Sequence, residues 1–171
     1  GGGTGIFVAV AGVNPLTVMP SMAGDLERIE SRLLESASTA DPTLTEIATH
    51  LIAAGGKRVR PGFTIAAAAT ALSADGPATE ESVTGGVAVE LVHLGSLYHD
   101  DVMDEAEVRR TVDSVNARWG NLRAILAGDF LLARASELAA SLGVEVAGLL
   151  ANTIGRLCEG QLLELQHAFD V

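Results

Sequence analysis

The residues best suited to chemistry lie in one stretch, Tyr98–Arg110, which reads YHDDVMDEAEVRR. Five acidic side chains fall within eight positions there, and two arginines follow at once. On a helix, Asp100 and Asp104 stand one turn apart on one face, with Asp101 beside them. Like charges at this spacing cost roughly 0.2–0.5 kcal/mol per pair, and acids near a helix C-terminus oppose its dipole. A shared divalent cation removes that cost, and Mg²⁺ binds through one or two carboxylates plus substrate phosphates.

An ordinary explanation of this cluster is a solvated acidic face balanced by the two arginines. The preceding residues, LVHLGSLYHDD, argue for more, because they carry an apolar helix face directly into the acids. Charge at the end of a buried stripe requires a partner or a function. His93 lies seven residues before Asp100 on the same stripe. It is either a core histidine or a ligand-binding group.

A second candidate is the loop AGGKRVRPG, residues 54–62. Gly55 and Gly56 permit left-handed backbone, and Lys57, Arg58 and Arg60 supply cationic donors in a chain with only 11 Lys and Arg. The loop is not a P-loop, because the GxxxxGK[ST] spacing is absent. It is a basic turn between helices or a diphosphate cradle. Together with Arg109 and Arg110, it predicts sites for two phosphate groups beside one metal.

Helical patterns run through almost the whole chain from residue 23 and form the scaffold for these residues. No alternating strand pattern is present, so the expected fold class is all-α. The expected helices are a first from residue 23, a second from 42 capped by Asp41 and stopped at Gly55, a third from Pro61, a long one over 83–107 after a loop at 75–82, and two more after residue 121.

Composition narrows the class of protein further. With 171 residues, 48% of them hydrophobic, the chain can bury one core. A net charge of −11 opposes non-specific binding to nucleic acid or to an anionic membrane. The single Cys158 indicates a reducing, cytoplasmic setting. The apolar run Ile6–Val13 is far shorter than the roughly 20 residues of a membrane helix, so we expect residues 1–22 to be a flexible tail and no integral membrane segment elsewhere.

Four motifs in order, GGKRVRP, ELVHLGSLYHDDVMDEAEVRR, NARWGNLRAILAGDFLLARA and EGQLLEL, resemble those of trans-isoprenyl diphosphate synthases, the polyprenyl synthetase family. The resemblance covers Leu26–Phe169. It implies an all-α barrel of antiparallel helices around a deep cavity, the isoprenoid synthase type, usually as a homodimer. Residues 23–171 would form the N-terminal half of that domain.

The resemblance also implies roles for individual residues. Asp100, Asp101 and Asp104 would hold Mg²⁺ on the diphosphate of an allylic substrate, which Arg109 would also contact. Lys57, Arg60, His93 and Arg110 would bind isopentenyl diphosphate, and Gln161 would face the cavity near the reacting ends. No role for Arg58 follows from the resemblance.

The implied reaction lengthens a trans-polyprenyl diphosphate. The allylic C–O bond ionises, the double bond of isopentenyl diphosphate attacks the carbocation, and a proton is lost, while metal and arginines stabilise the charge on the departing diphosphate. In the family, bulky side chains four and five positions before the first aspartate form the cavity floor. Here Ser96 and Gly95 occupy those positions. A product of C20 or longer is therefore expected.

The sequence departs from the family in one respect. The family's second aspartate-rich motif and downstream lysine-threonine site are not found in these 171 residues. The sequence thus predicts a truncated domain with little or no prenyltransferase activity alone. Two other functions stay open: a non-catalytic or regulatory subunit paired with a complete synthase, and an enzyme like a class I terpene synthase, which uses DDxxD-bound Mg²⁺ but needs no second diphosphate site.

Overall fold

A computed structural model describes residues 19–72 and 75–168. These residues form helices and one short antiparallel hairpin, which confirms the all-α class. The helices are α1 (Met22–Ser36), α2 (Pro42–Ala53), α3 (Val59–Leu72), α4 (Glu80–Met103), α5 (Val115–Trp119), α6 (Asn121–Ser141) and α7 (Val144–Ala168), and the hairpin pairs β1 (Val108–Arg109) with β2 (Val112–Asp113). The run Ile6–Val13 and most of the expected 1–22 tail lie outside the described residues. Among the helices described, none has both the length and the apolarity that a membrane crossing requires.

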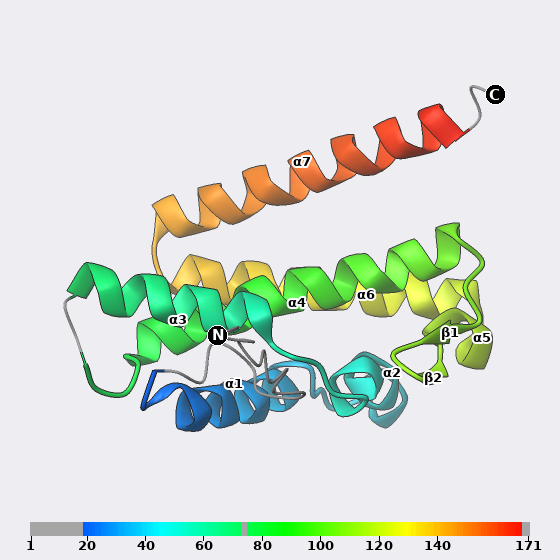
Figure 1. Cartoon of the computed structure of the whole chain (residues 1–171). Coiled ribbons are helices and arrows are strands. Elements are labelled where there is room, and N and C mark those ends of the chain that lie inside the picture. The colour runs from blue at the N-terminus through cyan, green and yellow to red at the C-terminus, as the bar shows by residue number, and fades with distance from the viewer. Residues whose placement is uncertain (1–18, 73–74, 169–171) are drawn as a thin grey trace, which may run out of the picture.

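The helices are stacked in layers around α4 and α6, which pack against each other. Figure 1 shows α1 and α2 on one side of this pair and α7 on the other. The hydrophobic core fills the first side, where Ile29, Leu33, Leu51, Leu91 and Leu131 are almost fully buried. The opposite side is more open, since Leu150 is the one buried side chain in the described part of α7.

The second helix begins and ends where the sequence predicts. The Asp41 carboxylate accepts a hydrogen bond from the backbone N–H of Leu44 at 2.9 Å, and Pro42 occupies the first turn. After the last turn, Gly55 adopts a φ of 83°. A capping carboxylate satisfies one free amide at the helix start, and glycine adopts left-handed backbone without a steric penalty.

The long helix α4 begins earlier than the expected residue 83. The Thr79 hydroxyl accepts a hydrogen bond from the backbone N–H of Ser82 at 3.2 Å, so the helix begins at Glu80. The acids of its first turn favour the helix dipole. Residues 80–82, expected in the loop, therefore form the first turn of the helix.

The same helix ends at Met103 rather than at residue 107. Glu105 adopts a left-handed φ of 51°, and the N–H of Ala106 donates to the carbonyl of Asp101 at 2.9 Å. This bond is the helix-terminating one of a Schellman motif. The motif usually contains glycine at the left-handed position. Because Glu105 occupies that position here, the predicted C-terminus of the helix was too late in the chain.

The hairpin contradicts the expectation that the chain has no strands. Arg109 pairs with Val112, and the two residues between them, Arg110 and Thr111, have φ values of 50° and 69°. A two-residue turn of this kind is normally signalled by Asn-Gly or Gly-Gly. Strands of two residues show no alternation and the turn contains no glycine, so the hairpin leaves no recognisable pattern in the sequence. The short helix α5 lies in the segment predicted to connect two long helices. It was not predicted because five residues are too few to show a helical pattern.

The helices α4 and α6 approach each other closely at two glycines. A Cβ at Gly95 would lie 3.0 Å from the carbonyl oxygen of Gly128, and a Cβ at Gly128 would lie 3.1 Å from that of Gly95. The Gly128 position also faces the imidazole of His99. The two backbones can meet at this distance only because neither residue carries a side chain.

We expect Gly128→Ala to lower the free energy of unfolding by about 1–3 kcal/mol, because overpacking a tight contact displaces backbone or His99. Urea denaturation of the purified chain measures this. The control is Gly155→Ala in α7, where an added Cβ meets nothing within 4 Å. That change should stabilise by about 0.5–1 kcal/mol through helix propensity alone. Equal stability of the two variants would contradict a tight α4–α6 contact.

Candidate functional site

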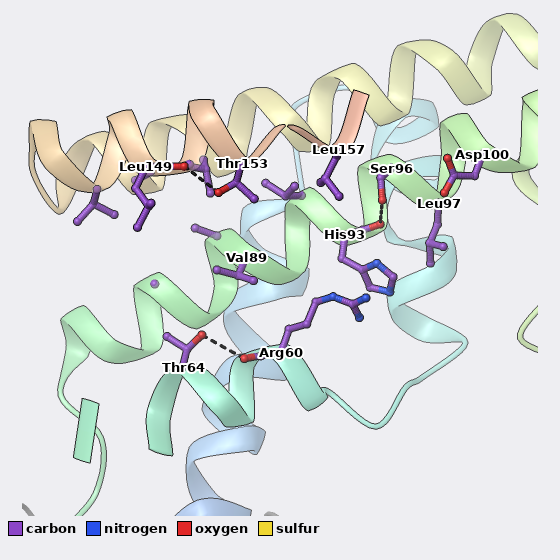
Figure 2. Close-up of a pocket in the computed structure, with 16 residues that line it drawn as sticks. Arg60, Thr64, Val89, His93, Ser96, Leu97, Asp100, Leu149, Thr153 and Leu157 are labelled. Carbon is purple, nitrogen blue, oxygen red and sulfur yellow. Dashed lines mark hydrogen bonds between the residues drawn. The ribbon is translucent and has the colours of Figure 1, made fainter. Parts of the chain in front are cut away.

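A cavity of about 560 Å³ lies between α3, α4 and α7. Figure 2 shows its charged side chains, Arg60 and Asp100, and the imidazole of His93 toward the end of α4 that carries the acids. The rest of its wall is mostly apolar. The apolar side chains include Val89, Val92, Leu97, Leu149, Leu150 and Leu157. The arrangement suits a ligand with a charged head and a hydrocarbon chain.

The polar end of this cavity is strongly positive. Arg60 and His93 point toward one another from α3 and α4 (Figure 2). Burial first, and then nearby positive charges, lower the pKa of His93 to about 4. Those charges belong to Arg60, Arg110, Arg109 and Arg58. A neutral imidazole beside four guanidinium groups provides hydrogen bonding and positive potential for an anion.

The basic loop and the hairpin arginines, far apart in sequence, meet in space. Arg110 donates from Nη1 to the carbonyl oxygens of Leu51, at 3.2 Å, and Gly55. These carbonyls lie at the C-terminal end of α2, where the helix leaves acceptors unpaired and favours positive charge. The structure therefore brings together the two basic clusters that the sequence singled out.

Within the loop, successive basic residues face opposite ways. The side chains of Lys57 and Arg60 are exposed, whereas Arg58 is buried and forms ion pairs with Glu30 at 2.7 Å and Glu90 at 3.1 Å. The exposed side chain of Arg60 also lines the cavity, so the structure brings it to the candidate site. Glu90 was not singled out by the sequence, although a lone acid inside the apolar pattern of a helix is a signal of a buried ion pair.

The three aspartates of the acidic motif occupy different environments. Asp100 lines the cavity and Asp104 is exposed at the end of α4. Asp101 is fully buried, and its Oδ1 accepts hydrogen bonds from Arg109, from Nε at 2.7 Å and also from Nη2. Its Oδ2 is buried without a hydrogen-bond partner in the described part of the chain. The structure thus brings Asp101 to Arg109 rather than to the cavity.

These residues fit a metal ion only in part. In residues 19–72 and 75–168, no group of three or more His, Cys, Asp or Glu side chains is arranged to hold a metal. Burial and then the charge of Asp104 raise the pKa of Asp100, so the two carboxylates repel. A divalent cation offsets such repulsion, and Mg²⁺ typically takes one or two carboxylates plus water and phosphate oxygens. Asp100 and Asp104 suit that kind of site, and Asp101, predicted as a third ligand, lies outside the pair.

Of the two positions predicted to form the cavity floor, only one faces the cavity. Ser96 lines the cavity, whereas Gly95 packs against Gly128 of α6, so a side chain at Gly95 would point into a helix contact. A smaller adjoining cavity of about 140 Å³ shares Ser96 and Asp100 with the first. Gln161 of α7 lines this smaller cavity, on the acidic side of the site.

The wall that α7 contributes was not predicted. Leu149, Thr153 and Leu157 line the main cavity from this helix (Figure 2). They recur every four residues, which is the period of one helix face. The sequence contains this stripe, but nothing in it distinguishes residues that face a cavity from residues that face a core.

Comparison with known proteins shows which sequences this chain resembles. The sequence model described as Polyprenyl synthetase matches residues 41–171. The nonaprenyl diphosphate synthase of Mycobacterium tuberculosis is 46% identical over 137 residues, which cover 80% of this chain and 40% of that protein. The heptaprenyl diphosphate synthase component 2 of Geobacillus stearothermophilus is 37% identical, over 86% of this chain and 45% of that protein.

Solved structures share the fold. A polyprenyl synthase from Caulobacter crescentus, complexed with calcium and isoprenyl diphosphate, superimposes with a TM-score of 0.80 at 33% identity, over 91% of this chain and 46% of that one. A geranylgeranyl pyrophosphate synthase from Corynebacterium glutamicum gives a TM-score of 0.72 at 40% identity, over 87% and 44%. The chain therefore spans less than half the length of the relatives it matches here.

We expect the neutral state of His93 to make the chain less stable in acid. Its ordinary pKa is 6.5 and its pKa in the fold is about 4. Between these values the unfolded chain binds a proton that the folded chain does not, so stability falls as pH falls from 6.5 to about 4. In His93→Gln this loss should be smaller, as measured by urea denaturation across that range. His167→Gln, at an exposed residue of α7, is the control. Identical acid profiles for His93→Gln and the unaltered chain would contradict the assignment.

Proposed function

This chain belongs to the polyprenyl synthetase family, and from that membership we propose that it carries substrate-binding residues of a prenyltransferase. The reaction joins an allylic diphosphate to isopentenyl diphosphate and gives a longer trans-polyprenyl diphosphate. One observation carries the proposal: an apolar cavity ends in a cluster of arginines and acids that suits diphosphates. The apolar wall accepts the hydrocarbon chain and the polar end accepts the charged groups.

The allylic diphosphate binds at the acidic end of α4. Asp100 and Asp104 would hold Mg²⁺, which when bound would supply positive charge to the departing diphosphate. Arg109 contacts the same diphosphate. Its guanidinium is fixed by the buried carboxylate of Asp101, so its orientation is set before the ligand arrives.

Isopentenyl diphosphate binds at the basic loop. Lys57, Arg60 and Arg110 supply charge, and His93 supplies an uncharged donor because its pKa of about 4 keeps it neutral near pH 7. The two diphosphates then lie at neighbouring positions of one cavity end. Holding both reactants in register converts a collision into an intramolecular step.

In the reaction, the chain's residues orient the substrates and exclude water. Arg109 stabilises negative charge on the leaving diphosphate as the allylic C–O bond breaks. The double bond of isopentenyl diphosphate attacks the carbocation, and a proton leaves the new allylic product. Val92 and Leu157 line the cavity and keep it apolar, and Gln161 lies beside the acidic residues. Further parts of this proposal are a homodimer and a cytoplasmic location.

Two other functions remain as outcomes of the test. A class I terpene synthase would use the acids on one allylic diphosphate and would have no use for the basic loop. A regulatory subunit would bind a complete synthase and add no turnover of its own. The basic loop and its junction with Arg110 favour the prenyltransferase over the terpene synthase.

The function is tested by incorporation of radiolabelled isopentenyl diphosphate into an allylic primer. We expect little or no product from the 171-residue chain alone, and Mg²⁺-dependent product when it is combined with a polypeptide carrying the family's second aspartate-rich motif. Asp100→Asn should reduce that product by about a hundredfold or more, because it removes a charge that acts in the transition state. Robust turnover by the chain alone would contradict the need for the second motif.

The remaining outcomes separate the alternatives. A hydrocarbon released without consumption of isopentenyl diphosphate would indicate a terpene synthase. A chain that co-purifies with a complete synthase, yet yields no product in any combination, would indicate a regulatory subunit.

Product length is the second test. We propose a product of C20 or longer, because Ser96 leaves the cavity wall small where a larger side chain would obstruct it. In the active combination, Ser96→Phe should shorten the product to C15 or less, as measured by chromatography of the dephosphorylated products. Ser96→Ala, which removes only a hydroxyl bonded to the carbonyl of His93, is the control and should not change the length. Unchanged length in Ser96→Phe would show that another residue sets the limit.

A further inference from the structure

Two arginines near the polar end of the cavity, Arg58 and Arg110, share one buried acid, Glu90. Glu90 of α4 is 2% exposed, and its Oε1 accepts a hydrogen bond from Nη1 of Arg58 at 3.1 Å. Nη2 of Arg110 lies 4.0 Å from the same oxygen. A buried carboxylate is costly unless it is paired, and here it offsets the repulsion between two guanidinium groups.

Arg58 ties the basic loop to three other parts of the fold. Its Nε and Nη2 donate to the two carboxylate oxygens of Glu30 in α1, at 2.7 and 2.8 Å. Nη2 also donates to the carbonyl of Ile52 in α2 at 3.0 Å, and Nη1 reaches Glu90 in α4. The planar fork of arginine makes such a set of bonds directional. In this position Arg58 adopts a left-handed φ of 46°, which is unfavourable for a residue other than glycine.

Both guanidinium groups lie directly against the backbone of the loop. A Cβ at Gly56 would lie 2.9 Å from Nη1 of Arg58 and 3.0 Å from Nη1 of Arg110. Arg110 also donates to the carbonyl of Gly55. The guanidinium groups of Arg58 and Arg110 therefore pack against the loop backbone, and Glu90 pairs with both of them.

We propose that Glu90 and Arg58 are positioning residues for the diphosphate site at the basic loop, a proposal that rests on the proposed function. Glu90 keeps Arg110 and Arg58 together under the loop. Arg58, pinned inward, fixes the backbone on either side of it, so that Lys57 and Arg60 extend toward the ligand.

Simple electrostatics makes the opposite prediction for Glu90. A carboxylate close to an anion site repels the anion, so its removal should strengthen binding. If Glu90 acts by position, its removal instead lets Arg58 and Arg110 move apart and weakens binding. The sign of the effect therefore separates the two roles.

The test is calorimetric titration of the unaltered 171-residue chain and its variants with inorganic pyrophosphate, without metal. Glu90→Gln should weaken pyrophosphate binding by about tenfold, the loss of roughly one charge-assisted interaction. Glu30→Gln should weaken it by a smaller factor, because it frees one side of the Arg58 fork. Glu80→Gln is the matched control: Glu80 also pairs with an arginine of α1, at 3.2 Å from Arg32, but in the first turn of α4. It should bind as the unaltered chain does.

The outcomes are decisive in each case. Binding by Glu90→Gln that equals or exceeds that of the unaltered chain would overturn the positioning role and leave the diphosphate site intact. No pyrophosphate binding by the unaltered chain would instead contradict the site and the proposed function with it. If Glu90→Gln does not fold, by circular dichroism, Glu30→Gln decides: weakened binding supports the proposal, and unchanged binding overturns it.

Discussion

Crowding of positive charge is the constraint on which the rest of the site depends. Burial and the positive charge of four guanidinium groups together keep the imidazole of His93 neutral. Such a cluster is unfavourable in a folded protein unless acids lie close by. The chain meets this need with buried carboxylates on α4: Glu90 serves Arg58 and Arg110, and Asp101 serves Arg109. One helix therefore supplies both the counter-charges and the wall of the cavity.

This arrangement separates structural acids from accessible ones. Glu90 and Asp101 are buried and pair with the protein's own arginines, whereas Asp100 and Asp104 are accessible to solvent. A divalent cation and a diphosphate would complete the charge balance at the accessible pair. The apolar lining beyond them lowers the local dielectric, which strengthens each remaining charge interaction. A ligand with a charged head and an apolar tail would thus place the two at opposite ends of one cavity.

The helices could be predicted and the candidate site residues singled out from the sequence, because both leave periodic or compositional signals. Asp41, Pro42 and Gly55 gave the limits of α2, and the basic loop was evident from its charge. The end of α4 and the hairpin were not predicted, because Glu105, Arg110 and Thr111 adopt backbone conformations that other residues usually supply. The different environments of the three aspartates were also beyond reach of the sequence. Spacing places Asp100 and Asp101 side by side, but only packing against Arg109 decides which of them is buried.

The two glycines at the α4–α6 crossing have a mechanical consequence. With Gly95 and Gly128 in backbone contact, α4 cannot approach α6 further, and the wall it gives to the cavity is stiff. The facing wall is α7, where Leu149 and Leu157 are largely exposed and Leu150 alone of the described side chains is buried. The two walls of the cavity thus differ: α4 is held at a fixed distance from α6, whereas α7 lines the cavity with side chains that are mostly exposed.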